Sequence, residues 1–388
     1  MAKPTRRLHR VLLLLLTLAF VLIALEVGSR LILGPPPRLA LASLEEVPRG
    51  QGTQRTYLVE VDKAPESGLY HHTSSGLRLI PDMKAVIKNH RLNGRDILIE
   101  TNGLGLRHRE LPPKQGDELR ILVLGDSITF ADYVDDNETF VRQLEERIIG
   151  DQESGRNVHV INAGVGAINL QTEYLILKEQ APAVQPDLVV IALYLNDAST
   201  SPVIKPLPYP LRLSQFMQWA QLKSFNLKHR WSGQRSEEDK QWIGEFERSN
   251  SPAEGDWRRE PRALAHEILQ SFGDWGYAWS DGAWNRMRPV LEKIRTFTDE
   301  SGFRTIVALL PVRQQVESQT LNDVPQKHFD RLLTELRLPH LDVLGALRDD
   351  WRTASQSLFY DHCHLTPRGN RVVANAIHEF LTGERFVD

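Results

Sequence analysis

From residue 119 onward, short apolar runs alternate with segments of helical periodicity, and this alternation restricts the folds open to the chain. Continuous apolar runs of strand length are typical of strands buried on both faces of a parallel sheet. The predicted strands are 120–124, 158–161, 188–193, 305–310 and 341–343, and the predicted helices are 137–149, 170–180, 284–300, 328–336 and 369–381. This order predicts an α/β fold, a three-layer doubly wound parallel sheet of about five strands.

The amino terminus has the pattern of a membrane signal anchor. Four basic residues precede an uncharged apolar run over 11–25, and a weaker apolar pattern that includes Glu26 and Arg30 continues to residue 33. The longer stretch reaches the roughly 20 residues that a membrane span requires. Charged side chains near its far end can reach the membrane interface. We predict a cytoplasmic tail (1–10) and a single transmembrane anchor (11–33), with the remainder periplasmic or extracellular.

Two other interpretations of this segment stay open. A cleaved signal sequence would use Ala40-Leu41-Ala42, but that site lies well past the apolar run and follows the prolines at 35–37. A buried helix of a soluble protein is the third possibility. The single cysteine, Cys363, excludes an intrachain disulfide but fits either the cytosol or a bacterial periplasm.

The remaining sequence divides by composition. Residues 34–50 are rich in proline and small residues and are interpreted as a linker. Residues 51–118 alternate short β-prone pieces with Gly and Asn turns, which predicts a small β-rich appendage. Residues 119–388 form the main domain, which is interrupted by an insertion at 200–283.

Two features of these accessory regions invite a functional interpretation. Tyr70-His71-His72 in the appendage would suit a metal site, but no third ligand sits at a helpful spacing, which favours a surface loop. Seven of the eight tryptophans fall within 219–284, and Phe216, Trp219, Leu222 and Phe225 recur at helical spacing. The insertion is therefore either a helical piece packing a small core of its own or an aromatic cap over the site that binds a glycan or acyl group.

A serine follows the first strand of the predicted sheet, in the sequence Gly125-Asp126-Ser127. Ligands of doubly wound folds bind at the carboxyl ends of the strands. Gly125 permits a tight exit from the strand, and the free N–H groups of a helix beginning here would favour a developing anion. Taken alone, this motif is weak, and Ser127 is better interpreted as a helix cap.

Asp361 and His364 make a nucleophilic serine the better interpretation. They lie three residues apart in one turn, so the carboxylate can orient the imidazole and stabilise its protonated form as a serine gives up its proton. A metal cluster over 361–364 is disfavoured because adjacent residues rarely converge on one ion. Cys363 is a poorer nucleophile, since the pairing geometry favours His364 with Asp361.

Acyl transfer also requires donors for an oxyanion. Gly164 follows the second predicted strand and could present its backbone N–H, and Asn196 follows the third and could present its side-chain amide. Because carboxyl ends of parallel strands share one edge of a sheet, we expect both residues to converge on Ser127. The chain has no Gly-x-Ser-x-Gly elbow, which argues against an α/β-hydrolase.

The ordered set of motifs resembles the SGNH/GDSL hydrolase family, in the membrane-anchored bacterial form with a β appendage. The matching segments are Gly125-Asp126-Ser127, Asn162-Ala163-Gly164, Asn196-Asp197 and Asp361-His362-Cys363-His364, with weaker support from 101–107. The resemblance implies a flavodoxin-like sheet, no metal or other cofactor, Ser127 as nucleophile, His364 as base, Asp361 as its orienter, and an oxyanion hole of Ser127, Gly164 and Asn196. One departure is Tyr194, where the family often has glycine, and the larger side chain is expected to narrow the cleft.

The expected function is a serine esterase that removes acyl groups from a carbohydrate or lipid through an acyl-enzyme. An O-acyltransferase acting on envelope glycan would share the first half-reaction, and a catalytically silent glycan-binding protein is the alternative from another class. The chain has 47 Lys and Arg residues against 50 Asp and Glu residues, and this balance does not indicate a nucleic-acid-binding protein. The acyl group and the oligomeric state are not predicted.

Overall fold

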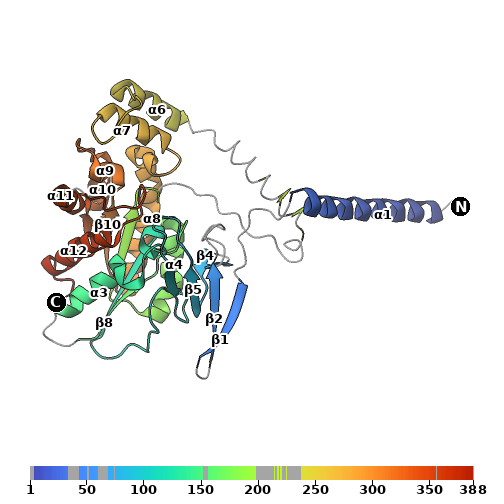
Figure 1. Ribbon diagram of the computed structural model, residues 1–388, viewed down its shortest axis with the longest axis horizontal. Helices are drawn as coiled ribbons and strands as arrows, with labels where there is room; N and C mark the ends of the chain where they lie inside the picture. Colours follow the sequence, from blue (N-terminus) through green and yellow to red (C-terminus); the bar gives the residue numbers. More distant parts are fainter. Residues whose placement is uncertain are drawn as a thin grey trace. The chain divides into compact units, whose positions relative to one another are not determined.

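The structure is a computed structural model, and the chain divides into two units that are described separately (Figure 1). One unit comprises Met1–Leu41 with Val203–Arg235, and the other Ala42–Pro202 with Ser236–Asp388. The structure describes residues 4–33, 43–49, 52–59, 69–73, 75–151, 156–197, 214, 216–217, 219–220, 224, 237–354 and 356–387.

The first unit contains the apolar amino-terminal helix. Helix α1 spans Pro4–Gly28 and continues as the π-helical turn η1, Ser29–Leu33. The helix begins at Pro4, because proline is tolerated at the first helical position. It therefore includes most of the residues that were expected to form a cytoplasmic tail (1–10). Within it, Leu12–Ile32 has a mean hydropathy of 2.5 and is long enough to cross a membrane. A signal sequence meets the same criteria, so the helix is consistent with either.

The second unit is built on the predicted parallel sheet. Its strands are β7 (Leu119–Gly125), β8 (Val158–Asn162), β9 (Leu188–Tyr194), β10 (Arg304–Leu310) and β11 (His340–Asp342). They pair in the order β11-β10-β9-β7-β8, and every pairing is parallel. In chain order this is 2-1-3-4-5, the flavodoxin-like arrangement. The α/β fold class predicted from the apolar runs is confirmed.

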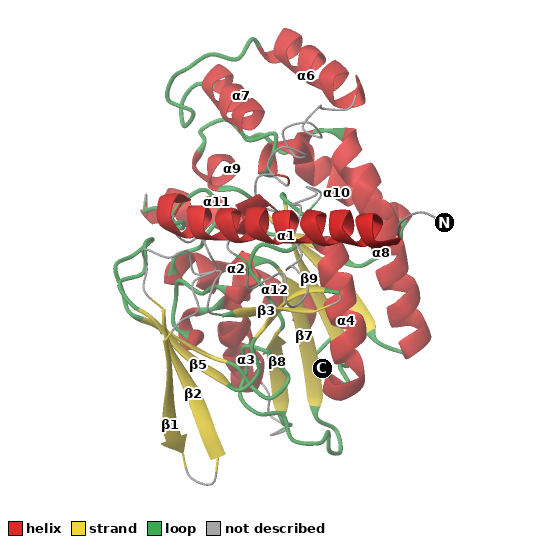
Figure 2. Ribbon diagram, turned by 90° about the vertical axis from the view of Figure 1, so that its right-hand side faces the viewer, coloured by secondary structure: helices red, strands yellow, loops and turns green. Residues whose placement is uncertain are grey.

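Helices cover both faces of this sheet. On one face α3 (Phe140–Asp151) packs against α12 (Pro367–Gly383), and on the other α4 (Leu170–Val184) packs against α8 (Asp281–Ser301) (Figure 2). Helix α10 (Val324–Glu335) contacts α8 and β11. Helices α9 (Arg313–Glu317) and α11 (Leu344–Ala354) were not expected from the sequence. The result is the predicted three-layer sandwich, with α2 (Ser127–Phe130) as a single turn directly after β7.

The appendage is β-rich, as predicted, but its boundaries differ from expectation. A four-stranded sheet has the order β1-β2-β5-β6, and β3 pairs with β4 as a separate hairpin. Strand β1 falls inside the expected linker, 34–50, because antiparallel pairing with β2 supplies backbone hydrogen bonds that composition does not reveal. Tyr70-His71-His72 lies in β3 instead of a surface loop. The strands are β1 (Ser43–Arg49), β2 (Gly52–Val59), β3 (Tyr70–Thr73), β4 (Gly76–Leu79), β5 (Met83–Ile87) and β6 (Ile97–Glu100).

The described part of the insertion is helical and packs into the main core. It contains α6 (Glu237–Asn250), α7 (Pro261–Gln270) and the 3-10 turn η5 (Trp275–Trp279). Trp275, Trp279 and Trp284 are buried in the same apolar cluster as the sheet. Trp242 and Trp257 are partly buried against the same cluster, so packing accounts for five of the seven tryptophans. The described part of the insertion therefore extends the main core, which differs from the first of the two interpretations, a separate small core. Leu222 and Phe225 lie outside the described residues.

Candidate active site

The chain makes a tight turn at the end of β7 that places Ser127 at the carboxyl edge of the sheet. Asp126 caps helix α2 by accepting a hydrogen bond from the Ile128 N–H at 2.9 Å. A Cβ atom on Gly125 would lie 2.0 Å from Thr129 Oγ1, so only glycine fits where the strand ends. The Ser127 side chain stays partly exposed, while Ile128, Thr129 and Phe130 of the same turn are buried.

The structure brings Ser127, His364 and Asp361 into one hydrogen-bonded chain. Ser127 Oγ lies 3.1 Å from His364 Nε2, and His364 Nδ1 lies 2.7 Å from Asp361 Oδ2. The other Asp361 oxygen accepts the backbone N–H groups of Cys363 and His364 at 2.9 and 2.8 Å. This turn therefore fixes both the carboxylate and the imidazole before any substrate binds.

The environment keeps Asp361 ionised. Burial alone would raise the pKa of its carboxyl, but the hydrogen bond and charge of His364, aided by the two backbone donors, hold this pKa well below its usual range. An ionised carboxylate at Nδ1 keeps the proton on that nitrogen and leaves Nε2 facing Ser127 as an acceptor.

Three buried carboxyl groups lie behind the nucleophile. Burial raises the pKa of Asp126 to about 6. Burial, reinforced by neighbouring carboxylates, also raises the pKa of Glu173, on α4, and of Asp197, after β9, well above their ordinary values. Asp197 accepts the Tyr194 N–H at 2.7 Å and thereby shapes the turn that carries Asn196. Sequence reasoning did not find Glu173, because a glutamate in the first turn of a helix is ordinarily exposed.

We expect Asp126 to make the protein less stable as pH rises. The folded state keeps the Asp126 proton up to about pH 6, whereas an unfolded aspartate has its ordinary pKa of 3.8 and releases the proton there. Stability therefore falls as pH rises through this window, by about 3 kcal/mol for this shift. Asp126→Asn should make the free energy of unfolding depend less on pH. Urea denaturation at a series of pH values from 4 to 7 measures this dependence. The exposed Asp117→Asn is the control, and equal slopes in all three proteins would contradict the prediction.

The structure corrects the expected role of Gly164. Its backbone N–H donates to Asn162 Oδ1 at 2.9 Å, so it is already engaged. A Cβ atom at Gly164 would lie 2.3 Å from the Phe130 backbone nitrogen, so this glycine is needed for close packing against α2. Sequence position alone could not separate the two glycines of this loop.

Gly166, the second glycine of this loop, lies beside Ser127. A Cβ atom built on Gly166 would lie 3.9 Å from the Ser127 Cβ and 2.4 Å from the Tyr70 hydroxyl, which places its backbone beside the nucleophile. Within the described part of the chain, the backbone N–H groups of Gly166 and Ser127 have no hydrogen-bond acceptor. Tyr70, which comes from β3 of the appendage, also packs its ring on Phe130. The appendage therefore contributes a wall of the site.

Asn196 lies at the end of β9, as predicted. Its side chain makes a hydrogen bond to Asp126 that favours the ionised form of that carboxyl and lowers its pKa, against the effect of burial. A carboxamide has two N–H donors, so a hydrogen bond to Asp126 leaves the second available. Tyr194, the departure from the family pattern, is fully buried and does not enter the cleft.

A buried arginine that the sequence analysis did not single out holds the loop after the nucleophile. Arg107 donates to the carbonyls of Phe130, Ala131 and Val134 at 2.7, 2.6 and 2.7 Å. Tyr133, in the same loop, packs edge-on against the His364 ring with centroids 4.8 Å apart. Arg107 thus positions the residue that packs on the imidazole. The signal available in the sequence was an arginine within a Gly-rich turn, which is too common to be diagnostic.

The insertion contributes Asp274, which pairs with His362 of the turn that carries Asp361 and His364. His362 Nε2 lies 3.5 Å from Asp274 Oδ2, and both side chains are partly exposed. Burial opposes protonation of His362, but Asp274 and Asp361 together raise its pKa. The His362 and His364 rings lie 6.5 Å apart, so this pair lies next to the imidazole that contacts Ser127.

Among the described residues, two groups of side chains have metal-ligating types, and the ligand atoms of both are already engaged by protein groups or protonated. Around Asp361, His364 Nδ1 is already hydrogen-bonded and burial raises the pKa of the Cys363 thiol, which keeps it protonated. In the second group, His108, Glu145 and His159, the guanidinium of Arg109 occupies the place of a cation: it lies 2.6 Å from Glu145 and 2.9 Å from His159 Nδ1.

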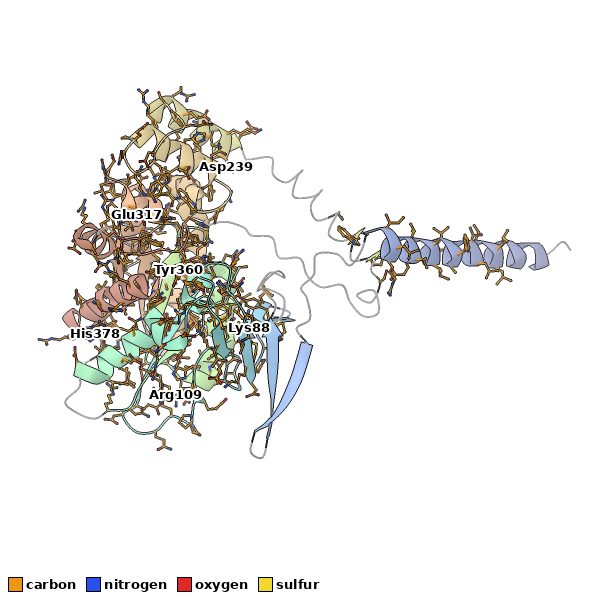
Figure 3. The ribbon with its side chains drawn as sticks, in the orientation of Figure 1. Lys88, Arg109, Asp239, Glu317, Tyr360 and His378 are labelled. Carbon is orange, nitrogen blue, oxygen red and sulfur yellow. The ribbon has the colours of Figure 1, made fainter. Side chains whose placement is uncertain are left out.

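The second group also lies at the amino ends of the strands, whereas Ser127 lies at the carboxyl ends. Arg109 contacts the carbonyl of Val158, the first residue of β8, whereas Tyr360 packs on Tyr133 beside the catalytic imidazole (Figure 3). A surface hollow of about 1040 Å³ is likewise lined by Leu119, Asp187 and Arg304, at the amino ends of the strands. It is therefore separate from the site at the carboxyl edge.

Comparisons with known proteins find similar folds only. No family model and no curated protein matches the sequence. A two-domain esterase active on acetylated mannans is 12% identical with a TM-score of 0.40, over 69% of this chain and 50% of that chain, so this chain spans about half its length. A catalytic variant of an acetylxylan esterase from Geobacillus stearothermophilus is 13% identical, with a TM-score of 0.40, over 69% of this chain and 96% of that chain. A member of the lipolytic G-D-S-L family from Veillonella parvula is 14% identical, with a TM-score of 0.37, over 68% and 98%.

Proposed function

We propose that the chain is an SGNH/GDSL-type serine esterase that cleaves acyl groups from a carbohydrate or a lipid. The observation that carries this proposal is the hydrogen-bonded chain from Ser127 through His364 to Asp361, at the edge of the sheet where doubly wound folds bind ligands. The proposal rests on this geometry, since the TM-scores of the similar structures lie below 0.5.

The geometry supports a two-step mechanism. Ser127 Oγ attacks the ester carbonyl while His364 Nε2 takes the serine proton, and ionised Asp361 stabilises the resulting imidazolium. Collapse of the tetrahedral intermediate expels the alcohol, which takes the proton from His364 and leaves an acyl-serine. Water then attacks the acyl-enzyme with His364 as base, which releases the acid and restores Ser127.

The oxyanion would be held by three donors. We assign the backbone N–H groups of Ser127 and Gly166 and the side-chain amide of Asn196, with Gly166 replacing Gly164 because the Gly164 N–H is engaged by Asn162. Preorganised donors in a partly buried site stabilise charge that develops only in the transition state.

Loss of the Asn196 donor should lower kcat much more than it raises KM. We expect Asn196→Ala and the isosteric Asn196→Asp each to reduce kcat by about 10²–10³-fold, the usual effect of removing one oxyanion donor. Steady-state hydrolysis of p-nitrophenyl acetate by the full chain measures this. Asn250→Ala, at an exposed helix end, is the control. An unchanged kcat for both Asn196 variants would remove this residue from the oxyanion hole.

Hydrolase and O-acyltransferase differ only in what attacks the acyl-enzyme. The polar pair of His362 and Asp274 beside the nucleophile favours a hydroxylated group in the cleft. The test is product analysis with an acetylated oligosaccharide, with and without an unacetylated glycan acceptor. Free acetate in both reactions supports the esterase, and acetyl transfer to the acceptor at the expense of free acetate supports the transferase. Retained glycan binding with no turnover and no covalent adduct would favour a silent binding protein.

We further propose that α1 anchors the protein in a membrane with the catalytic unit outside the cytoplasm. The helix has the length and hydropathy of a span, and the basic residues of the chain's first ten positions favour a cytoplasmic amino end. Fractionation with and without alkaline carbonate washing separates an uncleaved anchor from a cleaved signal sequence.

A further inference from the structure

We propose that Tyr70, which the appendage supplies, restricts the esterase to short acyl groups such as acetyl. Its side chain closes the side of the site into which the acyl chain of an ester extends. The inference rests on the esterase function proposed above and deepens it, because it names the class of acyl group that the site accepts.

The Tyr70 side chain borders the same small space as the nucleophile. A Cβ atom on Gly166 would lie 2.4 Å from the Tyr70 hydroxyl and 3.9 Å from the Ser127 Cβ, so both groups lie around one point. Only a glycine at position 166 allows the phenol to approach this closely. The Tyr70 side chain is partly buried, so part of its surface is left to contact a substrate.

The position of Tyr70 is fixed by packing on the catalytic domain. Its ring packs edge-on against the fully buried Phe130, with centroids 5.9 Å apart, and its backbone pairs with Leu79 in the β3–β4 hairpin. The hairpin is tied to α4 by Arg78, whose Nε lies 2.8 Å from Glu179 Oε2 and whose side chain is only 7% exposed. The phenol is therefore held in place and cannot easily move aside for a longer chain.

The proposed mechanism assigns this side of the nucleophile to the acyl chain. The carbonyl oxygen of the ester faces the oxyanion donors, which include the Gly166 N–H. The alcohol leaves next to the catalytic imidazole, because the imidazole gives it a proton. The acyl chain then extends in the remaining direction, away from the imidazole. Tyr133 packs on the imidazole, whereas Tyr70 packs on Phe130 beside Gly166, which places Tyr70 on the acyl side.

The test compares p-nitrophenyl acetate, butyrate and octanoate as substrates of the full chain. We expect kcat/KM of the wild type to fall by about 10-fold or more from acetate to butyrate, since methylenes that do not fit a pocket cost about 10–200-fold each. Tyr70→Ala removes the obstacle, so the butyrate-to-acetate ratio of kcat/KM should rise by about 10-fold. Both substrates are measured on one preparation, so any loss of folded protein cancels in the ratio.

Two further variants separate the ring from the hydroxyl and the site from the rest of the fold. Tyr70→Phe keeps the ring and should keep the preference for acetate. Tyr174→Ala is the matched control, because Tyr174 is also partly buried against an aromatic ring. That ring belongs to Phe297, which lines the hollow at the amino ends of the strands, so the variant should leave the ratio unchanged.

The outcomes distinguish this proposal from the esterase function. Ser127-dependent hydrolysis with the same ratio in the wild type and Tyr70→Ala would overturn the role of Tyr70 alone. An equal rise in Tyr174→Ala would also overturn it, because the effect would then be a general loosening of the fold. A loss of about 10²-fold in kcat on every ester in Tyr70→Phe, with no change of ratio in Tyr70→Ala, would make the hydroxyl an oxyanion donor instead. Absence of Ser127-dependent hydrolysis for all three esters would overturn the esterase function, and the role of Tyr70 with it.

Discussion

Replacing Ser127 by alanine is expected to lower kcat/KM for ester hydrolysis by about four to six orders of magnitude. The effect is large because Ser127, His364 and Asp361 form one hydrogen-bonded unit, and removing one member of such a unit abolishes most of its contribution. Folding should be little affected, since the side chain is partly exposed and its oxygen bonds only the imidazole. Hydrolysis of p-nitrophenyl esters by the full chain, beside thermal unfolding of the variant, measures both quantities.

Cys363→Ala is the matched control, because it removes the other nucleophilic atom next to His364. Cys363 Sγ lies 3.5 Å from His364 Nδ1, but burial raises the pKa of its thiol and keeps it protonated. We expect this variant to retain most of the activity. Loss of activity in Cys363→Ala together with retention in Ser127→Ala would reverse the assignment of the nucleophile.

Replacing Arg107 by methionine is expected to lower the free energy of unfolding by about 3–5 kcal/mol. Its guanidinium is fully buried, and its loss would leave the carbonyls of Phe130 and Val134 without this donor and the Ala131 carbonyl with only the Val134 N–H. Because the same loop holds Tyr133 against His364, activity should fall even at temperatures where the variant stays folded. Urea denaturation and ester turnover on one preparation measure both effects.

Two further variants sharpen this test. Arg107→Lys keeps the charge but cannot reproduce the planar fork of donors, so it should remain less stable than the wild type. Arg91→Met removes an exposed arginine from the appendage and should change stability by less than about 0.5 kcal/mol. If Arg107→Met unfolded at the same urea concentration as the wild type, the buried guanidinium would have no structural role.

The elements predicted correctly are those whose signal is local. The strands at 120–124 and 188–193 correspond to β7 and β9, because a strand buried on both faces needs apolar residues at every position. Asp361 and His364 were paired correctly because three residues in one turn leave little geometric freedom. The juxtaposition with Ser127 followed from the rule that parallel strands share a carboxyl edge.

The features that were missed depend on contacts between distant parts of the chain. Strand β1 is held by pairing with β2, and the part played by Tyr70 depends on β3 reaching Gly166. The reason for preferring Gly166 to Gly164 as a donor is a side-chain contact: Asn162 Oδ1 accepts the Gly164 N–H. None of these contacts leaves a periodic pattern in the sequence.

The proposed esterase function depends most on Ser127 being an activated nucleophile, and covalent labelling tests this directly. The full chain is treated with a fluorophosphonate, and intact mass and peptide mapping then locate the adduct. We predict one adduct per chain, on Ser127, that forms much more slowly in His364→Ala because the base is missing. A folded wild-type chain that gains no adduct, or gains one on a residue other than Ser127, would contradict the assignment.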